Sequence, residues 1–508
     1  MNKRVDSVLV LGGGSAGFLA AITIKHRLPR LPVTVVRSKD IGIIGVGEGT
    51  TLVLPQHLHD YLKISMDDFY RLAQPQWKLG IRFLWGKRPY FNYTFTRELD
   101  TKYHILEKGT GYYCDGPWDY VGLQSGLMHH NAIFPRDQSG WPIVDGTVAY
   151  HIENENFVNF LEGYARHQGI AIEDDTVEEV QQDEHGVTGL RMVTGRTMNA
   201  DLYVDCSGFA SVLLGKALAE PFVSFRPSLF NDRAVVGGWQ RTSEPIKPYT
   251  TAETMNAGWN WQIEHETRIN RGYVYSGDFI SDEAADAEFR AKCPKVEKTR
   301  VVRFRTGRFE RGWVKNVVAI GNSSGFVEPL EATSLGGIAV QCQALAESLI
   351  ECDRLVYPQL AEQFNLRNAR VWDEIRRFLA VHFKFNERLD TPYWRACRAD
   401  ADIGAAQDIV DYYREVGPSV LWRSTLISGT DQFGLEGYFS MLLGQQVPYK
   451  YEFRPSRNEQ QNWQRIQQAI KNKVTAAFTV PEGLALVRSD TWRWPQGVYK
   501  QNISAVRT

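Results

Sequence analysis

The chain has 508 residues, of which 43% are hydrophobic and 23% are charged, and its formal net charge at pH 7 is −1. A chain of this length buries a large core and usually folds as two or three domains. The balanced charge provides no general electrostatic field for nucleic acid or an anionic membrane, so we expect neither as a partner. The 12% of aromatic residues suits a large core and also an aromatic-lined pocket.

The cysteine pattern and the lengths of the apolar runs indicate which cell compartment the protein occupies. Six cysteines are scattered without a C-x-x-C pair, so we expect no metal site and no disulfide framework, and a reducing cytoplasmic location fits best. The apolar run Val8–Leu11 is short and ends in glycines, which is typical of a strand and not of a signal peptide. No stretch of 18 apolar residues occurs, so no membrane span is expected.

The N-terminal residues have the pattern of a βαβ unit. Val8–Leu11 is predicted to be a buried strand, residues 18–24 the start of a helix, and residues 33–36 a second buried strand. Between the first strand and the helix lies the loop 12–17, Gly-Gly-Gly-Ser-Ala-Gly, which matches G-x-G-x-x-G. A strand before such a loop and a helix after it favour a bound dinucleotide over a glycine turn without a ligand.

Later elements follow from periodicity. Residues 65–68 have capping-box form and predict a short helix that ends near Pro75. Alternating apolar residues after Lys78 predict a strand, and residues 86–148 are expected to be mostly irregular. The remaining predictions are a helix at 157–167, a hairpin within 187–204, an antiparallel sheet across 215–310, a buried strand at 317–320, and helices at 335–350, 358–385 and 400–415.

The second strand is followed by Arg37 and Ser38, where dinucleotide folds usually place an acidic residue for the adenosine ribose. An arginine at this position is compatible with a 2′-phosphate and therefore with NADP. Ser38 can take over a ribose contact, and the later segments described next favour FAD. We therefore predict FAD, and the sequence gives no reason for Arg37.

Four segments in this order resemble the flavin-dependent halogenases, in their tryptophan-halogenase-like branch: the loop 12–17 and residues 76–83, 259–263 and 321–335. The resemblance extends to about residue 345 and is weaker beyond it. It implies an α/β fold with an FAD-binding module of the two-dinucleotide-binding-fold (glutathione-reductase) type, an antiparallel substrate sheet and a C-terminal helical region. We divide the chain into residues 1–345, which hold the FAD module, the inserted Lys78 segment and the sheet, and residues 346–508, a mainly helical region packed on it.

The resemblance also implies roles for individual residues. Lys78 and Glu331 are the expected catalytic pair, and Glu331 would accept the arenium proton or orient the halogenating agent. The backbone N–H groups of Thr333 and Ser334 would hold the halide, and Trp259 and Trp261 would line the tunnel between flavin and substrate. The implied cofactor-binding residues are Gly12, Gly14, Ser15, Ala16, Gly17, Arg37, Ser38, Gly47, Glu48, Val177, Asn322 and Leu335. No metal is expected.

The residues alone allow plainer interpretations. A lysine is usually a solvated surface residue, although its place in an apolar strand near Arg82 predicts partial burial and a lowered pKa for Lys78. Glu331 is also suited to cap a helix, and two tryptophans at i and i+2 are commonly strand core. Residues 400–460 are expected to shape a lid over the pocket, with Phe433, Tyr438 and Phe439 as candidate walls.

The implied activity is that of an FADH2-dependent halogenase. In this family reduced FAD and O2 give a C4a-hydroperoxide that oxidises chloride or bromide to hypohalous acid, and Lys78 would relay the halogen to a free electron-rich aromatic. Glu331 favours an indole-type substrate, because halogenases for carrier-bound rings generally lack it. With a single glycine loop, we expect a separate NAD(P)H-dependent flavin reductase to supply FADH2 to a monomer or homodimer. The alternatives are a flavin-dependent aromatic monooxygenase and a catalytically silent FAD-binding protein.

Three positions depart from the family pattern. Glu264 stands where the family motif WxWxIP ends in proline, Ala332 stands where the tryptophan enzymes have serine, and Ala210 stands where an arginine is frequent. We expect these changes to leave the chemistry intact and to place the chain in a divergent branch.

Overall fold

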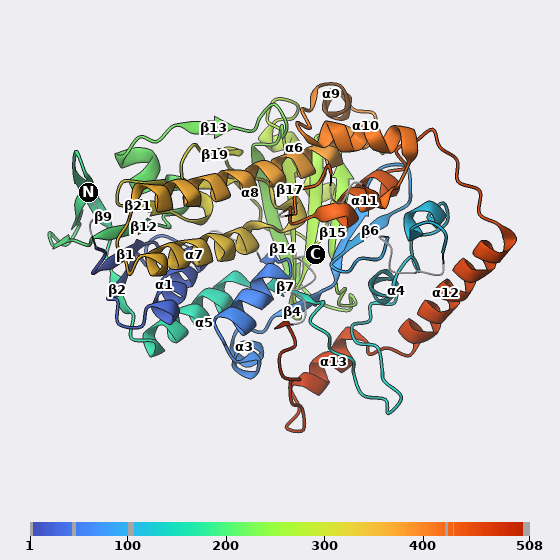
Figure 1. Ribbon diagram of the computed structural model, residues 1–508, viewed down its shortest axis with the longest axis horizontal. Coiled ribbons are helices and arrows are strands. Elements are labelled where there is room, and N and C mark those ends of the chain that lie inside the picture. Colours follow the sequence, from blue (N-terminus) through green and yellow to red (C-terminus); the bar gives the residue numbers. More distant parts are fainter. Residues whose placement is uncertain (1–3, 43–46, 100–105, 422–424, 430, 501–508) are drawn as a thin grey trace. The chain divides into compact units, whose positions relative to one another are not determined.

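The computed structural model describes residues 4–42, 47–99, 106–421, 425–429 and 431–500. The chain forms two compact units, each assembled from three separate segments. Figure 1 labels the helices and strands. The first unit comprises Met1–Gln74, Ile152–Arg226 and Phe304–Ile375, and the second comprises Pro75–His151, Pro227–Arg303 and Arg376–Thr508. The predicted division at residue 345 stays a prediction.

The first unit is organised around a six-stranded sheet in the order β20-β21-β12-β1-β2-β8. All neighbouring pairs are parallel except β20 with β21. The central strand β1 is buried along its whole length, which is typical of a parallel sheet covered on both faces. The strands are β1 (Val8–Leu11), β2 (Val33–Arg37), β8 (Ala171–Asp174), β12 (Leu202–Asp205), β20 (Trp313–Val314) and β21 (Val317–Ala319).

Helix α1 (Ser15–Arg27) packs against both α5 (Asn154–His167) and α7 (Ser334–Glu351), and this packing completes the predicted βαβ unit. Helix α3 (Met66–Leu72) begins as predicted, with the Ser65 hydroxyl accepting from the Asp68 N–H (3.3 Å). Two small sheets complete the unit: β9 (Val177–Asp183), β10 (Gly186–Met192) and β11 (Thr197–Met198), and β13 (Phe222–Ser224), β19 (Gly307–Phe309) and β22 (Gly325–Phe326). The predicted hairpin is therefore β10–β11, while β12 joins the large sheet.

The second unit contains the predicted antiparallel sheet, seven strands in the order β18-β14-β17-β16-β15-β5-β6. Its only parallel pair among the described strands is β15 with β5. The strands are β5 (Gly80–Leu84), β6 (Phe91–Thr94), β14 (Arg233–Gln240), β15 (Thr250–Met255), β16 (Gly258–Glu264), β17 (Arg268–Tyr275) and β18 (Arg300–Arg303). Side chains alternate between faces, so Trp259 and Trp261 share one face of β16 and Gln262 and Glu264 share the other.

A short strand, β4 (Gln76–Lys78), precedes β5 and pairs with β7 (Ala149–Ile152) in antiparallel fashion. Helix α8 (Pro358–Lys384) confirms the prediction of a helix at 358–385. Its first part belongs to the first unit and its last part to the second. The other helices of the second unit are α4 (Leu123–His129), α6 (Asp282–Lys292), α9 (Pro392–Asp400), α10 (Ala406–Val416), α11 (Gly434–Gly444), α12 (Arg457–Thr475) and α13 (Val480–Val487). Among the described residues, no helix is long and apolar enough to cross a membrane.

Candidate active site

The glycine loop of the first unit has the geometry of a dinucleotide cradle. Gly12 has φ +126°, and a Cβ on it would lie 2.2 Å from the Cys206 carbonyl oxygen. A Cβ on Gly17 would lie 1.9 Å from the Gly12 oxygen, so both positions require glycine for packing. Gly14 is different, because a Cβ there would meet no atom within 4 Å. The open space lies at the N-terminus of α1, where a pyrophosphate would be held by backbone N–H groups.

The later flavin-type segments lie against this loop. A Cβ on Gly321 would lie 3.1 Å from the Ala16 Cβ, so the segment that carries Asn322 packs against the first turn of α1. Asp205 ends β12 and is buried, and its carboxylate accepts from the backbone N–H groups of Leu213 (2.7 Å) and Leu214 (2.9 Å). The carboxylate therefore holds the following helical turn in place beside the loop.

Arg37 forms an ion pair that sequence reasoning did not find. Its guanidinium donates to the Glu162 carboxylate at 2.8 Å, and both side chains are largely buried. Glu162 lies in α5 and also pairs with Arg166 (2.8 Å). This pairing gives Arg37 a structural partner in place of a 2′-phosphate. Ser38 accepts a hydrogen bond from Thr176 (2.9 Å), one residue before Val177, so the adenosine end of the predicted site is ordered by contacts within the unit.

Residues 45–50, which resemble the flavin-strap segment of the halogenases, are described from Gly47 onward, and Gly45 and Val46 lie outside the described residues. Gly47 has φ +87°, a left-handed conformation that glycine adopts at little cost. Glu48 follows in the short strand β3 (Glu48–Gly49) and accepts from the Asn154 side chain at 3.0 Å. Burial raises the pKa of Glu48 to about 7, so this carboxyl group is poised to exchange a proton near neutral pH.

The N-terminus of α7 has the features expected of an anion site. Thr333 is its N-cap, and the Thr333 side chain makes no capping hydrogen bond to the first N–H groups of the helix. A Cβ on Gly336 would approach Thr51 Oγ1 at 3.0 Å, whereas a Cβ on Gly337 would meet nothing within 4 Å. The open side of the first turn therefore lies at Gly337. A flat ring can approach the backbone there, and the helix dipole favours an anion nearby.

Glu331 lies in the same segment, in a 3-10 turn (Pro329–Glu331) that ends three residues before α7. Its side chain is buried, and only 2% of the residue is exposed. The next residue, Ala332, has φ +55°, a left-handed conformation that is strained for an alanine. Strain of this kind persists where the surroundings hold the backbone in place, and it is frequent at active sites.

Lys78 lies in the second unit, on β4, and none of its surface is exposed. Its ammonium lies 5.3 Å from the centre of the Phe95 ring, within the range of a cation–π contact. Trp77 packs edge-on against Phe134 at 5.0 Å. Sequence reasoning predicted partial burial for Lys78, and the structure buries it completely, on a strand whose partner β7 lies about 70 residues further along the chain.

Trp259 and Trp261 stand side by side on β16, with ring centres 6.1 Å apart. The Trp261 ring lies directly over Gly272 of β17, where a Cβ would come within 2.0 Å of the indole. Its indole nitrogen is buried without a hydrogen-bond partner among the described residues. The pair therefore presents an apolar wall with one polar atom still to be satisfied, which suits a tunnel and equally a packed strand face.

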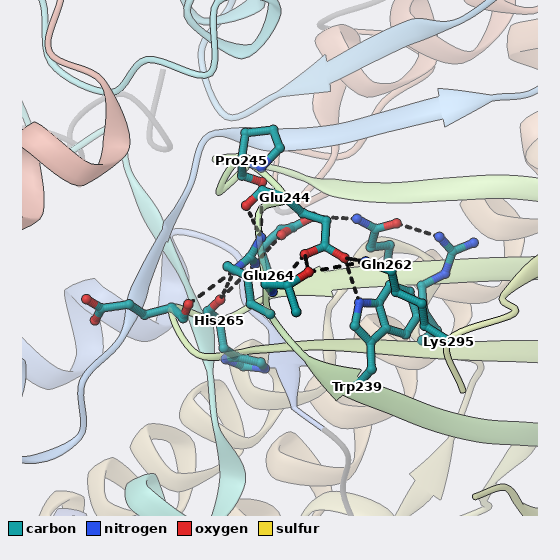
Figure 2. A network of polar contacts seen from close by, with 11 residues as sticks. Trp239, Glu244, Pro245, Gln262, Glu264, His265 and Lys295 are labelled. Atoms are coloured by element: carbon teal, nitrogen blue, oxygen red, sulfur yellow. Dashed lines mark hydrogen bonds and ion pairs between the residues drawn. The ribbon is translucent and has the colours of Figure 1, made fainter. Parts of the chain in front are cut away.

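Glu264, which replaces the family's proline, is the centre of a buried polar network (Figure 2). Gln262 donates to its carboxylate at 2.6 Å, and the Arg241 guanidinium forms an ion pair with it. Arg241 also donates to the backbone carbonyl of His265 (2.8 Å), and Gln262 accepts from Arg271. A proline has no side chain that accepts such bonds, so this face of the sheet is held together differently from the family pattern.

The candidate lid residues of α11 lie in a dense aromatic cluster. Phe433 stacks on Phe378 of α8 with ring centres 3.9 Å apart, and Tyr438 meets the same ring edge-on at 5.3 Å. Phe433, Tyr438 and Phe439 are all buried. Their role as pocket walls stays a prediction.

Sequence reasoning missed two buried polar residues beside Lys78. His151 is fully buried and bonds to Thr250 at 2.8 Å. Gln76 is also buried, and neither atom of its amide has a partner among the described residues. The only signal was position: His151 is a polar residue inside the apolar strand β7, and Gln76 lies two residues before Lys78.

The geometry divides the predicted residues into two groups. The first unit brings together the glycine loop, Arg37, Glu48, Asn322 and the N-terminus of α7, and it has the open positions that a flavin requires. The second unit brings Lys78 together with the tryptophan-bearing sheet. A dinucleotide module with a buried lysine on a separate sheet defines the chain as a flavoenzyme of the oxidoreductase class.

Comparison with known proteins gives the family. Residues 7–457 match the protein-family model for tryptophan halogenase. Tryptophan 7-halogenase RebH of Lentzea aerocolonigenes is 32% identical over 442 residues, which cover 82% of this chain and 83% of RebH. The chain belongs to the tryptophan halogenase family, and it is a flavin-dependent halogenase.

Solved structures agree over nearly the whole chain. The structure of MibH, titled "a lathipeptide tryptophan 5-halogenase", superposes with a TM-score of 0.88 at 36% identity and covers 98% of both chains. Tar14, a tryptophan C-6 flavin-dependent halogenase from taromycin biosynthesis, superposes with a TM-score of 0.85 at 28% identity, covering 96% of this chain and all of that one. The predicted fold class is confirmed, and the family implies FAD and a halide.

Proposed function

We propose that this chain uses FADH2, O2 and chloride or bromide to halogenate the ring of a tryptophan-type indole. The observation that carries the proposal is the complete burial of Lys78 over an aromatic ring, on a strand next to the tryptophan-bearing sheet. Burying an ammonium group costs several kcal/mol, so its retention in the interior points to a functional role. The relatives named above act on tryptophan, which sets the substrate class.

The first unit would hold FAD with the residues of its cradle. Gly14 and the N-terminus of α1 would receive the pyrophosphate, and Gly337 would leave room for the isoalloxazine ring. A bound reduced flavin would supply two electrons to O2, and the activated oxygen would take two electrons from the halide to give hypohalous acid. The backbone N–H groups of Thr333 and Ser334 would hold the halide, because the N-terminal end of a helix favours an anion.

The second unit would deliver the halogen. Trp259 and Trp261 would wall the path and keep the substrate away from the flavin. Lys78 would then hold the oxidised halogen, by donating a hydrogen bond or as a haloamine, in front of the ring that attacks it. Glu331 would remove the proton from the arenium intermediate or orient the halogenating agent.

Two substrate forms are supported by different relatives. RebH and Tar14 are named for tryptophan itself, which supports a free indole-type substrate. MibH is named for a tryptophan in a lathipeptide, and it resembles this chain over 98% of its length. A peptide-borne tryptophan is therefore the second candidate. In either case a separate NAD(P)H-dependent flavin reductase would supply FADH2.

Product analysis tests the proposal. The purified protein would be given FADH2 from a reductase, O2, and either chloride or bromide, with free tryptophan, other indoles, phenols and a tryptophan-containing peptide as substrates. Mass spectrometry should show a mass gain of one halogen on an indole. Oxygenated products in place of halogenated ones would support the monooxygenase alternative, and no O2-dependent turnover would support a silent flavoprotein.

A further inference from the structure

His151 lies on β7, which pairs with the short strand β4 that carries Lys78. In the β4–β7 ladder His151 stands directly opposite Gln76. Residues opposite each other in an antiparallel pair point to the same face, and so do residues two apart on one strand. The side chains of His151, Gln76 and Lys78 therefore share one face. After Lys78 the chain continues through Leu79 into β5, which belongs to the seven-stranded sheet.

A side-chain hydrogen bond joins β7 to β15, in addition to the backbone bond from the Leu79 N–H to the Pro248 carbonyl (2.8 Å). His151 Nε2 and Thr250 Oγ1 are 2.8 Å apart, and both residues are buried. Thr250 is the first residue of β15, and Ala252, two residues on, stands opposite Trp261. Thr250 therefore points to the face of the seven-stranded sheet that carries the tryptophans. The bond therefore connects β7, the partner of the strand that carries Lys78, with the face of the seven-stranded sheet that carries Trp261.

The charge state of His151 suits this place. Burial lowers the pKa of His151 well below its usual value, and the nearby basic groups of Lys78, His265 and Arg241 lower it further, while the backbone carbonyl of Glu264 opposes the shift. The imidazole is therefore neutral at physiological pH. A neutral ring can hold Thr250 without adding a second cation beside the ammonium of Lys78.

We propose that His151 is a positioning residue for Lys78: by bonding Thr250, it fixes the Lys78 strand against the sheet that carries Trp259 and Trp261. The inference rests on the proposed role of Lys78. A lysine that receives a diffusing oxidant and presents it to a ring must be held in place, because a displacement of about 1 Å can cost about 100-fold in rate. Loss of the bond would let oxidised halogen escape before it reaches the substrate.

The test measures coupling, which is the halogenated product formed per O2 consumed, together with hypohalous acid trapped in solution by monochlorodimedone. His151→Leu and Thr250→Val each remove the bond, and His151→Gln keeps an amide that reaches Thr250. We expect the first two to lower coupling by about 10-fold or more and to raise trapped hypohalous acid, while His151→Gln stays within about threefold of the parent. The double variant should show coupling no lower than the lower of the two single variants, because each substitution removes the same bond.

A matched control separates positioning from stability. His57 in the first unit is also buried and bonds a threonine, Thr23, at 3.0 Å. His57→Leu should lower the unfolding midpoint and leave coupling unchanged. If His151→Leu and Thr250→Val lower only the unfolding midpoint, as His57→Leu does, the inference is wrong. If His151→Leu does not fold, Thr250→Val decides, since it keeps the shape of the side chain.

Lys78→Met separates this inference from the proposed function. If Lys78→Met still halogenates at the parental rate, the role of Lys78 fails and the positioning role of His151 fails with it. If Lys78→Met is inactive while both bond-removing variants keep full coupling, only the inference about His151 is overturned.

Discussion

Replacing Gly337 by alanine should stabilise the flavin-free protein and weaken flavin binding at the same time. Gly337 lies in the first turn of α7, and a Cβ there would meet no atom within 4 Å. Alanine therefore adds no clash and reduces the freedom of the unfolded chain, which raises the free energy of unfolding by about 0.4–1 kcal/mol. The same methyl group would enter the space assigned to the isoalloxazine ring. A tenfold loss of FAD affinity, about 1.4 kcal/mol, is the minimum effect we expect.

Two measurements on the same variant decide the matter: urea unfolding of the flavin-free protein and calorimetric titration with FAD. Gly163→Ala is the matched control, because Gly163 lies in α5 and a Cβ there also meets nothing within 4 Å. The control should gain similar stability and bind FAD normally. Unchanged FAD affinity in Gly337→Ala would refute the placement of the ring, and a loss of stability would refute the reasoning from open space.

Three further outcomes are expected. Lys78→Met should abolish halogenated product while O2 consumption by FADH2 continues, as followed by mass spectrometry and an oxygen electrode; retained product would count against the relay. Glu331→Gln should slow product formation by about 10²–10⁴-fold with FAD affinity unchanged, whereas a lower unfolding midpoint with normal turnover would make it a helix cap. Arg241→Leu should lower the free energy of unfolding, measured in urea, by about 3–5 kcal/mol, because it leaves the Glu264 carboxylate buried without its cation. Glu264→Gln should cost less, since Arg241 keeps backbone carbonyl partners; equal losses would contradict this asymmetry.

Local pattern was sufficient for much of the fold. The glycine loop between a buried strand and a helix predicted the βαβ unit, and alternation predicted the sheet that holds Trp259 and Trp261. These features depend on neighbours in sequence, where backbone preference and burial act directly. The order of the four motifs along the chain predicted the family, because no single motif is specific enough by itself.

Long-range pairing explains what the sequence did not show. Arg37 was unexplained because its partner, Glu162, is 125 residues away. Lys78 was expected to be partly exposed because nothing near it in sequence reveals that β7 covers its strand. Glu264 looked like a neutral departure from a motif, and its importance depends on an ion pair with Arg241, which lies 23 residues earlier, directly after β14. Such contacts are set by tertiary packing, which periodicity does not encode.

The way the chain is divided between the units has a consequence for its synthesis. Each unit is assembled from three segments, and the first unit lacks α7 and the strands β20 and β21 at one edge of its sheet until residues 304–375 have been made. The N-terminal strands must therefore wait, with apolar surface exposed, while more than half of the chain is translated. Folding dominated by such distant contacts is slow and prone to aggregation. Low temperature and chaperone co-expression should raise the soluble yield more than they would for a protein whose units are continuous in sequence.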